Sequence, residues 1–498
     1  MKKTSQLQSK SKGFLNMNFK ALNFHRCMII ILCIFLEASC KKAVEVSTPQ
    51  TLIVGSQVYN NNSTAASVLT GLYSNSFGTS GFSGGVAISY ECGLYADELQ
   101  LYSQSNMASV QYYTNSLLNN STSFWPGMYN GIYVCNAAIE GLTQSTGVTT
   151  AVKQQLIGEA KFCRAFIYTY AVNLYGNVPL ITSTDYLANE KAANTSPAQV
   201  YQQIITDLQD AENLLSANYL ASDVQTTTTE RTRPTKWAAA ALLARAYLYY
   251  SSLSGATSSF ANAEAQATTV INNSMYSLSP LTGSNSVFKK NSSEAIWQLQ
   301  PTSPNINTPD GSLYILTTAP ANVSAGTGVS LSSNLLGAFE SGDNRRADWV
   351  GSITVQGTTY YYPYKYQVKT GSTLTEYNMM LRLGEQYLIR AEARAQQGET
   401  TQAVADLNVI RNRAGLPNYS GGTDKASLIA AIFHERQVEL FTELGHRFFD
   451  LKRAGTINAV MGSVAPQKGG TWNANKALFP IPISDILNDS NLTQNPGY

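Results

Sequence analysis

Apolar residues recur at helical spacing in several long segments of the chain. Between residues 156 and 174, apolar and small side chains follow one another at three- and four-residue steps, so they share one helix face. Gly176 and Pro179 then end this segment. Further helices are predicted after Pro197 and after Pro234, the latter in the run WAAAALLARAYLYY, where small alanines permit close helix packing.

The clearest repeat-like unit covers residues 381–416, where Gly398 separates two helical segments. Its length and its small residues lie near the tetratricopeptide consensus, which has a period of about 34 residues. A similar pairing joins residues 237–250 with 260–271. Short helices of this kind cannot bury their apolar faces alone, so we expect the pairs to stack into a superhelical scaffold.

Other stretches are rich in Gly, Ser, Thr, Pro and Tyr and lack a helical period. They cover residues 78–85, 301–333 and 360–375, and we expect loops there, with short strands at 351–362 and 295–299. The predicted fold is therefore mainly α: tetratricopeptide-like helix pairs form a superhelical scaffold that carries a loop-rich lobe with a few short strands.

The N-terminal segment is typical of an export signal. A basic stretch precedes the nine uncharged residues MIIILCIFL at 28–36, far fewer than the roughly 20 that a membrane-spanning helix needs. Small residues then precede Cys40, as in the lipobox at which bacteria acylate a cysteine, although Glu37 replaces the usual leucine. An ordinary signal peptide with a chance cysteine and a buried N-terminal helix are the alternatives, and Met17 is a second possible start.

These patterns divide the chain into four parts. We expect a signal peptide at 1–39, a lipidated tether at 40–57, an N-terminal region with helical repeats at 58–280, and a C-terminal region with the loop-rich lobe and a helical repeat at 281–498. The last two regions are expected to pack as one globular unit. Two or more acyl chains on Cys40 would give stable membrane attachment.

Composition excludes some classes of function. The net charge is +2 and no Lys/Arg run follows the tether, so nucleic-acid binding has no electrostatic support. The chain has 29 tyrosines but only 13% charged residues, a mixture that suits stacking on neutral polar ligands.

Cys92, Cys135 and Cys163 show no CxxC spacing, which favours small buried hydrophobes over a zinc site or a disulfide framework. No cofactor is expected; no EF-hand loop is present, and a structural calcium ion stays open.

Catalytic motifs are absent from the sequence. The sequence has no GxSxG nucleophile elbow, since its one GxSxG string, GFSGG at 81–85, lies in a predicted loop. It has no HExxH, no Walker A and no GxGxxG that begins a βαβ unit. Asp97 and Glu98 form the obvious carboxylate pair, but adjacent residues point in different directions, whereas a glycosidase needs two carboxylates across one sugar. A hydrolase is therefore the least favoured interpretation.

A charged segment near the C-terminus could be mistaken for an acid/base site. Its three- and four-residue spacings predict ion pairs along a helix, such as Arg436 with Glu439 or Glu443 with Arg447. Where such charges meet the interior, we expect them to tie helices together, so a structural role is favoured.

Several of these segments together resemble the SusD/RagB family. LIGEAKFCRAFIYTYAVNLYGNVPLI at 156–181 is similar to its N-terminal signature, and HERQVELFTELGHRFFDLKRAG at 434–455 to its C-terminal signature. FPIP and NLTQNPGY at the end of the chain look like its closing motif. Smaller similarities are GLY at 71–73, YADE at 95–98 and EAIWQLQ at 294–300. The matches follow the family's order along nearly the whole mature chain.

The resemblance implies an outer-membrane lipoprotein, anchored through Cys40 and facing the exterior. It implies a SusC-like TonB-dependent transporter as partner. Because the best-understood members bind oligosaccharides, we expect capture of oligo- or polysaccharide and its delivery to that transporter, without catalysis. Binding of peptides or other nutrients on the same scaffold is the alternative. The family has no fixed ligand motif that this sequence matches.

Sugar rings pack their C–H faces on aromatic planes, so aromatic residues outside the helical stripes are the candidate platforms. They are Tyr102, Tyr112, Tyr113, Tyr314, Trp349, Tyr360, Tyr361 and Tyr362. Candidate polar partners are Asn106, Asn115, Asp343 and Arg346. Trp125, Trp237 and Trp297 lie inside helix or strand patterns and are predicted to be core.

Overall fold

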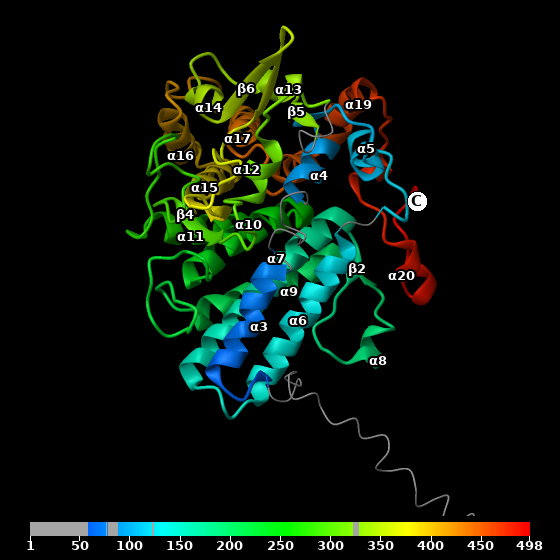
Figure 1. The fold of residues 1–498 in the computed structure, drawn as a ribbon, viewed down its shortest axis with the longest axis vertical. Coiled ribbons are helices and arrows are strands. Elements are labelled where there is room, and N and C mark those ends of the chain that lie inside the picture. Colours follow the sequence, from blue (N-terminus) through cyan, green and yellow to red (C-terminus); the bar gives the residue numbers. More distant parts are fainter. Residues whose placement is uncertain (1–57, 76, 78–87, 122–123, 322–327) are drawn as a thin grey trace, which may run out of the picture. The chain divides into compact units, whose positions relative to one another are not determined.

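Helices follow one another along most of the chain in the computed structural model (Figure 1). The structure describes residues 58–75, 77, 88–121, 124–321 and 328–498. The predicted signal peptide at 1–39, the lipidation site Cys40, the tether at 40–57 and the predicted loop at 78–85 lie outside these residues. The chain from Val58 to Tyr498 forms one compact unit.

The first half of this unit is built almost entirely from helices. They are α3 (Asn62–Asn75), α4 (Ile88–Tyr95), α5 (Met107–Tyr113), α6 (Trp125–Gln144), α7 (Thr150–Tyr175), α8 (Tyr186–Asn189), α9 (Pro197–Leu214), α10 (Lys236–Ser254) and α11 (Thr257–Ile271). Short strands interrupt them at β1 (Leu99–Leu101), β2 (Val178–Pro179) and β3 (Asn194–Thr195).

The second half mixes strands with helices. Its strands are β4 (Ala295–Leu299), β5 (Val329–Leu331), β6 (Val350–Val355), β7 (Thr358–Pro363) and β8 (Asn378–Arg382). Its helices are α12 (Pro309–Tyr314), α13 (Ser333–Ala338), α14 (Asn344–Asp348), α15 (Leu383–Gln397), α16 (Thr400–Arg413), α17 (Lys425–Glu439), α18 (His446–Arg453), α19 (Ile457–Gln467), η2 (Ala474–Ala477) and α20 (Ile483–Asn488).

The long helices begin and end where the sequence predicts. Pro197 occupies the first turn of α9, where its missing N–H is not needed, and the Ser196 hydroxyl accepts the Gln199 N–H at 3.5 Å. Gly176 ends α7 with a φ of 73°, and Gly398 ends α15 with a φ of 85°. Glycine adopts this left-handed backbone without strain, so both positions stop a helix.

Helices that follow one another in sequence also pack together. α6 lies against α7, α7 against α9, α9 against α10, and α10 against α11, while α11 contacts α15 and thereby joins the two halves. Figure 1 shows α3, α6, α7 and α9 as a layer of neighbouring helices. The mainly α fold predicted from the sequence is confirmed.

The strands of the described chain pair two by two, all antiparallel: β1 with β5, β2 with β3, β4 with β8, and β6 with β7. The strand predicted at 295–299 is β4. The segment predicted as a strand at 351–362 is a hairpin, because Gln356 and Gly357 turn the chain with φ values of 49° and 80°. Short helices α12 and α13 lie partly in the segment predicted as loop at 301–333.

A large apolar core runs through both halves, and a smaller cluster lies between α15, α16 and α17. Cys92, Cys135 and Cys163 are buried and unpaired in disulfides, as predicted. Trp125 and Trp297 are core residues, whereas Trp237 is only partly buried and donates its indole N–H to the Ala217 carbonyl at 3.0 Å.

The charged C-terminal segment ties distant elements together, but not through the predicted local pairs. Arg436 bonds Asp450 with an Nε–Oδ2 distance of 2.7 Å instead of Glu439. Glu443 binds Arg382 and Lys365 instead of Arg447. The predicted pairs were wrong because these side chains point inward, where partners from other elements replace solvent.

Glu439 is the centre of this buried network. Arg382 and Arg345 lie within 2.6 and 2.9 Å of its carboxylate, and Arg413 also contacts it. Burial opposes ionisation of Glu439, but the guanidinium groups of Arg413, Arg382 and Arg345 hold its pKa well below the usual range. The segment therefore has a structural role.

Candidate ligand-binding surface

Strand β1 brings Tyr102 to the edge of the loop-rich lobe. β1 pairs with β5 from Leu99↔Leu331 to Leu101↔Val329, and the Tyr102 N–H continues the ladder by donating to the Gly328 carbonyl at 2.8 Å. β5 in turn contacts β7 of the hairpin. Figure 1 shows β5 beside the β6–β7 hairpin at one end of the described unit.

At this junction the rings of Tyr102 and Tyr360 meet. Their centroids are 5.5 Å apart and their planes cross at 83°, an edge-to-face contact. Tyr102 is 37% exposed, and its hydroxyl accepts a hydrogen bond from Ser330 Oγ at 3.2 Å. Two aromatic residues from opposite halves of the chain thus form one exposed surface, which we call the Tyr102–Tyr360 surface.

The other two tyrosines of β7 are held in place by their neighbours. The guanidinium of Arg346 lies 4.4 Å from the ring centroid of Tyr361, which supports the ring by a cation–π contact. Tyr362 pairs with Gly351 on β6, and its ring packs closely over this glycine. A Cβ added at Gly351 would fall 2.3 Å from a Tyr362 ring atom. Tyr360, Tyr361 and Tyr362 are all half-buried, so part of each side chain is accessible.

Polar residues follow Tyr102 along the chain. Ser103 and Ser105 follow it, with their hydroxyl oxygens 2.8 Å apart, and Asn106 caps α5 by accepting the Ser109 N–H at 3.3 Å. Ring, hydroxyls and amide together can stack on and hydrogen-bond to a neutral polyhydroxyl ligand.

Four of the predicted platforms are core residues instead. Tyr112, Tyr113, Tyr314 and Trp349 are each at most 5% exposed. Tyr112 packs against Tyr95 and Phe479, and the Trp349 indole donates to the Leu281 carbonyl at 3.2 Å. This burial leaves the four side chains almost no surface to offer a ligand. Sequence alone does not separate a core aromatic in an irregular segment from an exposed one.

Two of the four predicted polar partners are buried, and two are not. Asn115 is fully buried and donates to the Tyr95 carbonyl at 2.7 Å, and buried Asp343 binds Arg345 at 2.8 Å. Neither faces a ligand surface. Arg346 contacts Tyr361, and Asn106 is an exposed residue four positions after Tyr102, so both stay candidates. Ser330 was missed, because its position beside Tyr102 depends on the β1–β5 pairing.

The carboxylates of Asp97 and Glu98 both accept hydrogen bonds that join segments of the fold. Asp97 accepts two hydrogen bonds from Arg447, and Glu98 accepts the Thr442 N–H at 3.0 Å. Burial raises the pKa of Glu98 to about 8. Both side chains are almost fully buried, so neither is placed to reach a sugar.

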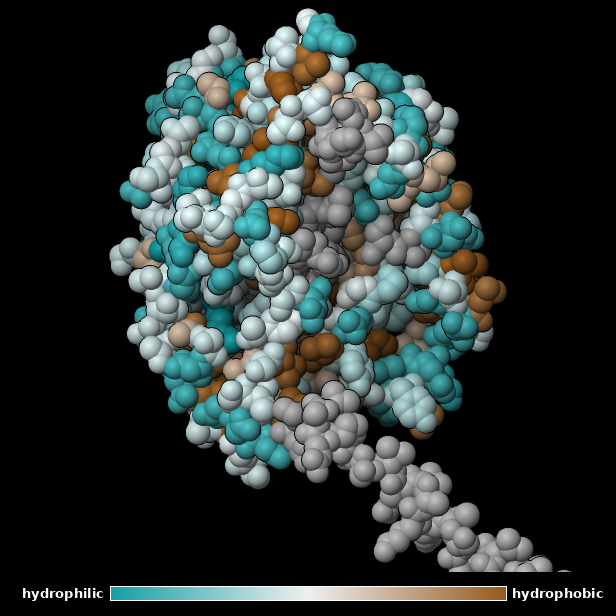
Figure 2. Space-filling model, in the orientation of Figure 1, coloured by the Kyte–Doolittle hydropathy of each residue, from teal (hydrophilic) through white to brown (hydrophobic). Residues whose placement is uncertain are grey.

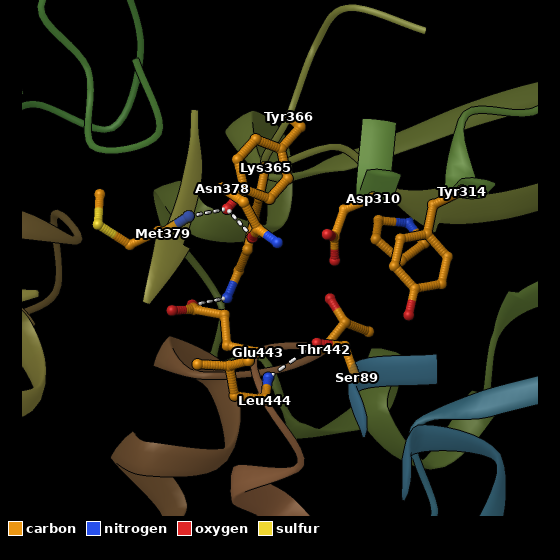
Figure 3. A pocket seen from close by; sticks show the side chains of 11 residues that line it. Ser89, Asp310, Tyr314, Lys365, Tyr366, Asn378, Met379, Thr442, Glu443 and Leu444 are labelled. Carbon is orange, nitrogen blue, oxygen red and sulfur yellow. Dashed lines mark hydrogen bonds and ion pairs between the residues drawn. The ribbon is translucent and has the colours of Figure 1, made fainter. Parts of the chain in front are cut away.

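A small polar cavity near this pair is shown in Figure 3. Asp310 and Tyr314 face Lys365 and Glu443 across it, and the ammonium of Lys365 bonds Glu443. Burial raises the pKa of Asp310 to about 7 and lowers that of Lys365 to about 8. The cavity volume is about 10 Å³, which suits roughly one water molecule and no sugar ring.

A larger cleft opens between α3, the loop before α10 and the end of β4. Its volume is about 560 Å³, and hydroxyl groups of Thr70, Ser74, Thr228 and Thr302 are in its wall. It is large enough for a small ligand. Among the described residues, Tyr73 is the one aromatic residue that lines this cleft, which makes the cleft a poorer stacking surface than the Tyr102–Tyr360 surface.

Figure 2 shows a face that is mostly polar, with separate hydrophobic spots. Within the described ranges, no helix is long and apolar enough to cross a membrane. Nor, in the same ranges, do three His, Cys, Asp or Glu side chains gather in a way that could hold a metal ion.

Two family models match separate parts of the sequence. One, described as the SusD family, matches residues 349–498, and the other, described as starch-binding associating with outer membrane, matches residues 82–248. The chain belongs to the SusD family. SusD-like protein P2 of Formosa agariphila is 28% identical over 428 residues, which cover 76% of this chain and 80% of that protein.

Solved SusD structures share the fold. A SusD homologue from Bacteroides thetaiotaomicron superposes with a TM-score of 0.75 at 22% identity, covering 89% of this chain and 98% of that one. A laminarin-binding SusD-like protein superposes with a TM-score of 0.70 at 23% identity, covering 88% of this chain and 100% of that one. The helical scaffold and the loop-rich lobe are therefore those of the SusD fold.

Proposed function

We propose that this protein captures an oligo- or polysaccharide at the Tyr102–Tyr360 surface without cleaving it. The observation that carries the proposal is the edge-to-face pair of Tyr102 and Tyr360 at the protein surface, with the Ser330 hydroxyl bonded to Tyr102. An exposed ring supplies the apolar plane for a sugar face, and nearby hydroxyls and amides supply its polar contacts.

Family membership supports the class of ligand. One matching family model is described as starch-binding, and one structural neighbour is described as laminarin-binding. Both descriptions name glucose polymers, which makes α- and β-glucans the first ligands to test.

The state of the most obvious acidic pair supports a non-catalytic role. The obvious carboxylate pair, Asp97 and Glu98, is buried and bonded to Arg447 and Thr442. A glycosidase of the usual kind needs one carboxyl group as acid and a second as base or nucleophile, both facing the sugar.

The proposal includes location and partner. Acylation of Cys40 would anchor the protein in the outer membrane, facing the exterior, and the bound glycan would pass to a SusC-like TonB-dependent transporter. The outer-membrane association in the description of the matching family model supports this arrangement.

The experiment uses the chain from Val46 onward, without signal and lipid site. Calorimetry and affinity gels test it against starch, laminarin, other plant, fungal and host polysaccharides, and peptides. Saturable glycan binding without release of reducing sugar is the expected result. Binding of peptides alone would replace the glycan proposal, and product release would overturn the non-catalytic one.

A further inference from the structure

Two tyrosines of β7 lie on the same face of the β6–β7 hairpin. Tyr360 and Tyr362 are two positions apart, and the register of the hairpin pairs them with Ile353 and Gly351 of β6. Alternate residues of a strand point to the same face of a sheet, and so do directly paired residues. Positions on one face of a strand repeat about every 6.6 Å, which sets the spacing of Tyr360 and Tyr362 along β7.

Contacts at both ends extend this pair into a row. Tyr102 meets Tyr360 edge to face, as described above. The rings of Tyr362 and Tyr364 have centroids 5.9 Å apart and planes that cross at 86°. The Tyr364 N–H donates to the Trp349 carbonyl at 2.8 Å, which continues the hairpin ladder beyond β7. Tyr102, Tyr360, Tyr362 and Tyr364 therefore follow one another in a line, which we call the tyrosine row.

Gly351 allows the ring of Tyr362 to lie across β6. A Cβ added at Gly351 would fall 2.3 and 2.5 Å from two ring carbons of Tyr362 and 2.9 Å from its hydroxyl oxygen. The outer end of the ring therefore covers the glycine, and a larger residue at position 351 would displace it. The backbone of β6 thus fixes the position of this ring in the row.

The opposite face of the hairpin carries hydroxyl groups instead of a row of rings. Ser352, Thr354 and Thr359 are exposed there. Tyr361 shares that face but packs against the core, with the Arg346 guanidinium against its ring. The three row residues from β7 onward are half-buried, so part of each is accessible. The line of aromatic contacts is therefore confined to one face.

We propose that the tyrosine row selects a straight glycan chain of the cellulose, mannan or xylan type, which would lie along β7 and contact several rings at once. This inference rests on the glycan binding proposed above and adds the shape and minimum length of the ligand. A straight chain presents its sugar faces one after another in a line, whereas starch and laminarin chains coil away from a line. A disaccharide is too short to span the row.

Calorimetry with matched oligosaccharides tests the proposal. Cellohexaose, mannohexaose and xylohexaose are each compared with their disaccharides, and all three with maltohexaose, which has the same length but coils. We expect one straight hexaose to bind at least about tenfold more tightly than its disaccharide and than maltohexaose. Equal binding of hexaose and disaccharide, or of straight hexaose and maltohexaose, overturns the proposal and leaves glycan capture intact. Binding of no glycan at all overturns the proposed function as well.

Two variants test whether the far end of the row carries binding. Tyr362→Leu keeps an apolar side chain over Gly351 but removes the ring, and Tyr364→Leu removes the last ring. Each should weaken binding of the straight hexaose at least about fivefold. Ser352→Ala, on the opposite face, should bind like the wild type.

Melting temperatures within a few degrees of the wild type show that the variants are folded. Wild-type affinity in both Tyr362→Leu and Tyr364→Leu overturns the row. If Tyr102→Ala still weakens binding in that case, glycan capture at the Tyr102–Tyr360 surface stands without it.

Discussion

Arg447 holds Asp97 by two parallel hydrogen bonds, with Nε–Oδ1 and Nη2–Oδ2 distances of 2.8 and 2.7 Å. The pair joins α18 to the segment between α4 and β1, which are far apart in sequence. Both side chains are largely buried, so the carboxylate and the guanidinium depend on each other for compensation.

Arg447→Met should therefore lower the free energy of unfolding by about 3 kcal/mol, because it leaves the Asp97 carboxylate buried and uncompensated. Denaturant titration measures the change. Lys161→Met is the control, since its partner Asp210 is 45% exposed on the side chain and such pairs contribute at most about 1 kcal/mol. Equal losses in both variants would contradict the account.

Glu98 should make stability depend on pH. Burial raises its pKa from 4.5 to about 8, so the folded chain binds this proton more tightly than the unfolded chain. Its contribution to stability is then greatest below about pH 4.5 and falls as the pH rises towards 8. Glu98→Gln removes this titration.

The stability of Glu98→Gln relative to the wild type should therefore increase between pH 5 and pH 8.5. Thermal unfolding of both proteins at the two pH values measures the difference. Other titrating groups are common to both proteins and largely cancel. A difference that stays constant with pH would mean that Glu98 does not titrate in this range.

Lys468 caps the end of α4. Its ammonium donates to the carbonyls of Leu94, Tyr95 and Ala96 at 2.7, 3.2 and 2.8 Å. Lys468→Met should destabilise the fold by about 2–3 kcal/mol, because the carbonyls of Leu94 and Ala96 lose this buried donor, while the Tyr95 carbonyl keeps Asn115. In Lys425→Met, where the lysine bonds one exposed carbonyl, denaturant titration should show a much smaller loss. A Lys468→Met protein as stable as this control would refute the capping role.

The spacing of apolar residues was enough to predict the main helices of the scaffold. The stripe that ends at Gly176, the helix after Pro197 and the pair around Gly398 are all present as α7, α9 and α15–α16. These elements depend on local spacing and local stop signals, which a sequence displays directly.

Contacts between distant segments could not be predicted in the same way. Arg436 was assigned a neighbour on its own helix, but its partner Asp450 lies on α18. Tyr112 and Tyr360 both come from aromatic-rich stretches, yet the first packs in the core and the second meets Tyr102 at the surface. Which tyrosine stays exposed depends on the β1–β5 and β6–β7 pairings.

The central claim is glycan binding at the Tyr102–Tyr360 surface, and one comparison tests it most directly. The affinity for the best glycan of the panel is measured by calorimetry for the wild type, Tyr102→Ala, Tyr360→Ala and Tyr186→Ala. Tyr186 is a matched control because it is 71% exposed on α8, away from this surface.

We expect Tyr102→Ala and Tyr360→Ala to weaken binding about tenfold or more, equivalent to about 1.4 kcal/mol. Both variants should stay folded, with melting temperatures only a few degrees lower, because each loses the same ring pair. Tyr186→Ala should bind like the wild type. Wild-type affinity in both Tyr102→Ala and Tyr360→Ala would place the glycan elsewhere and contradict the account.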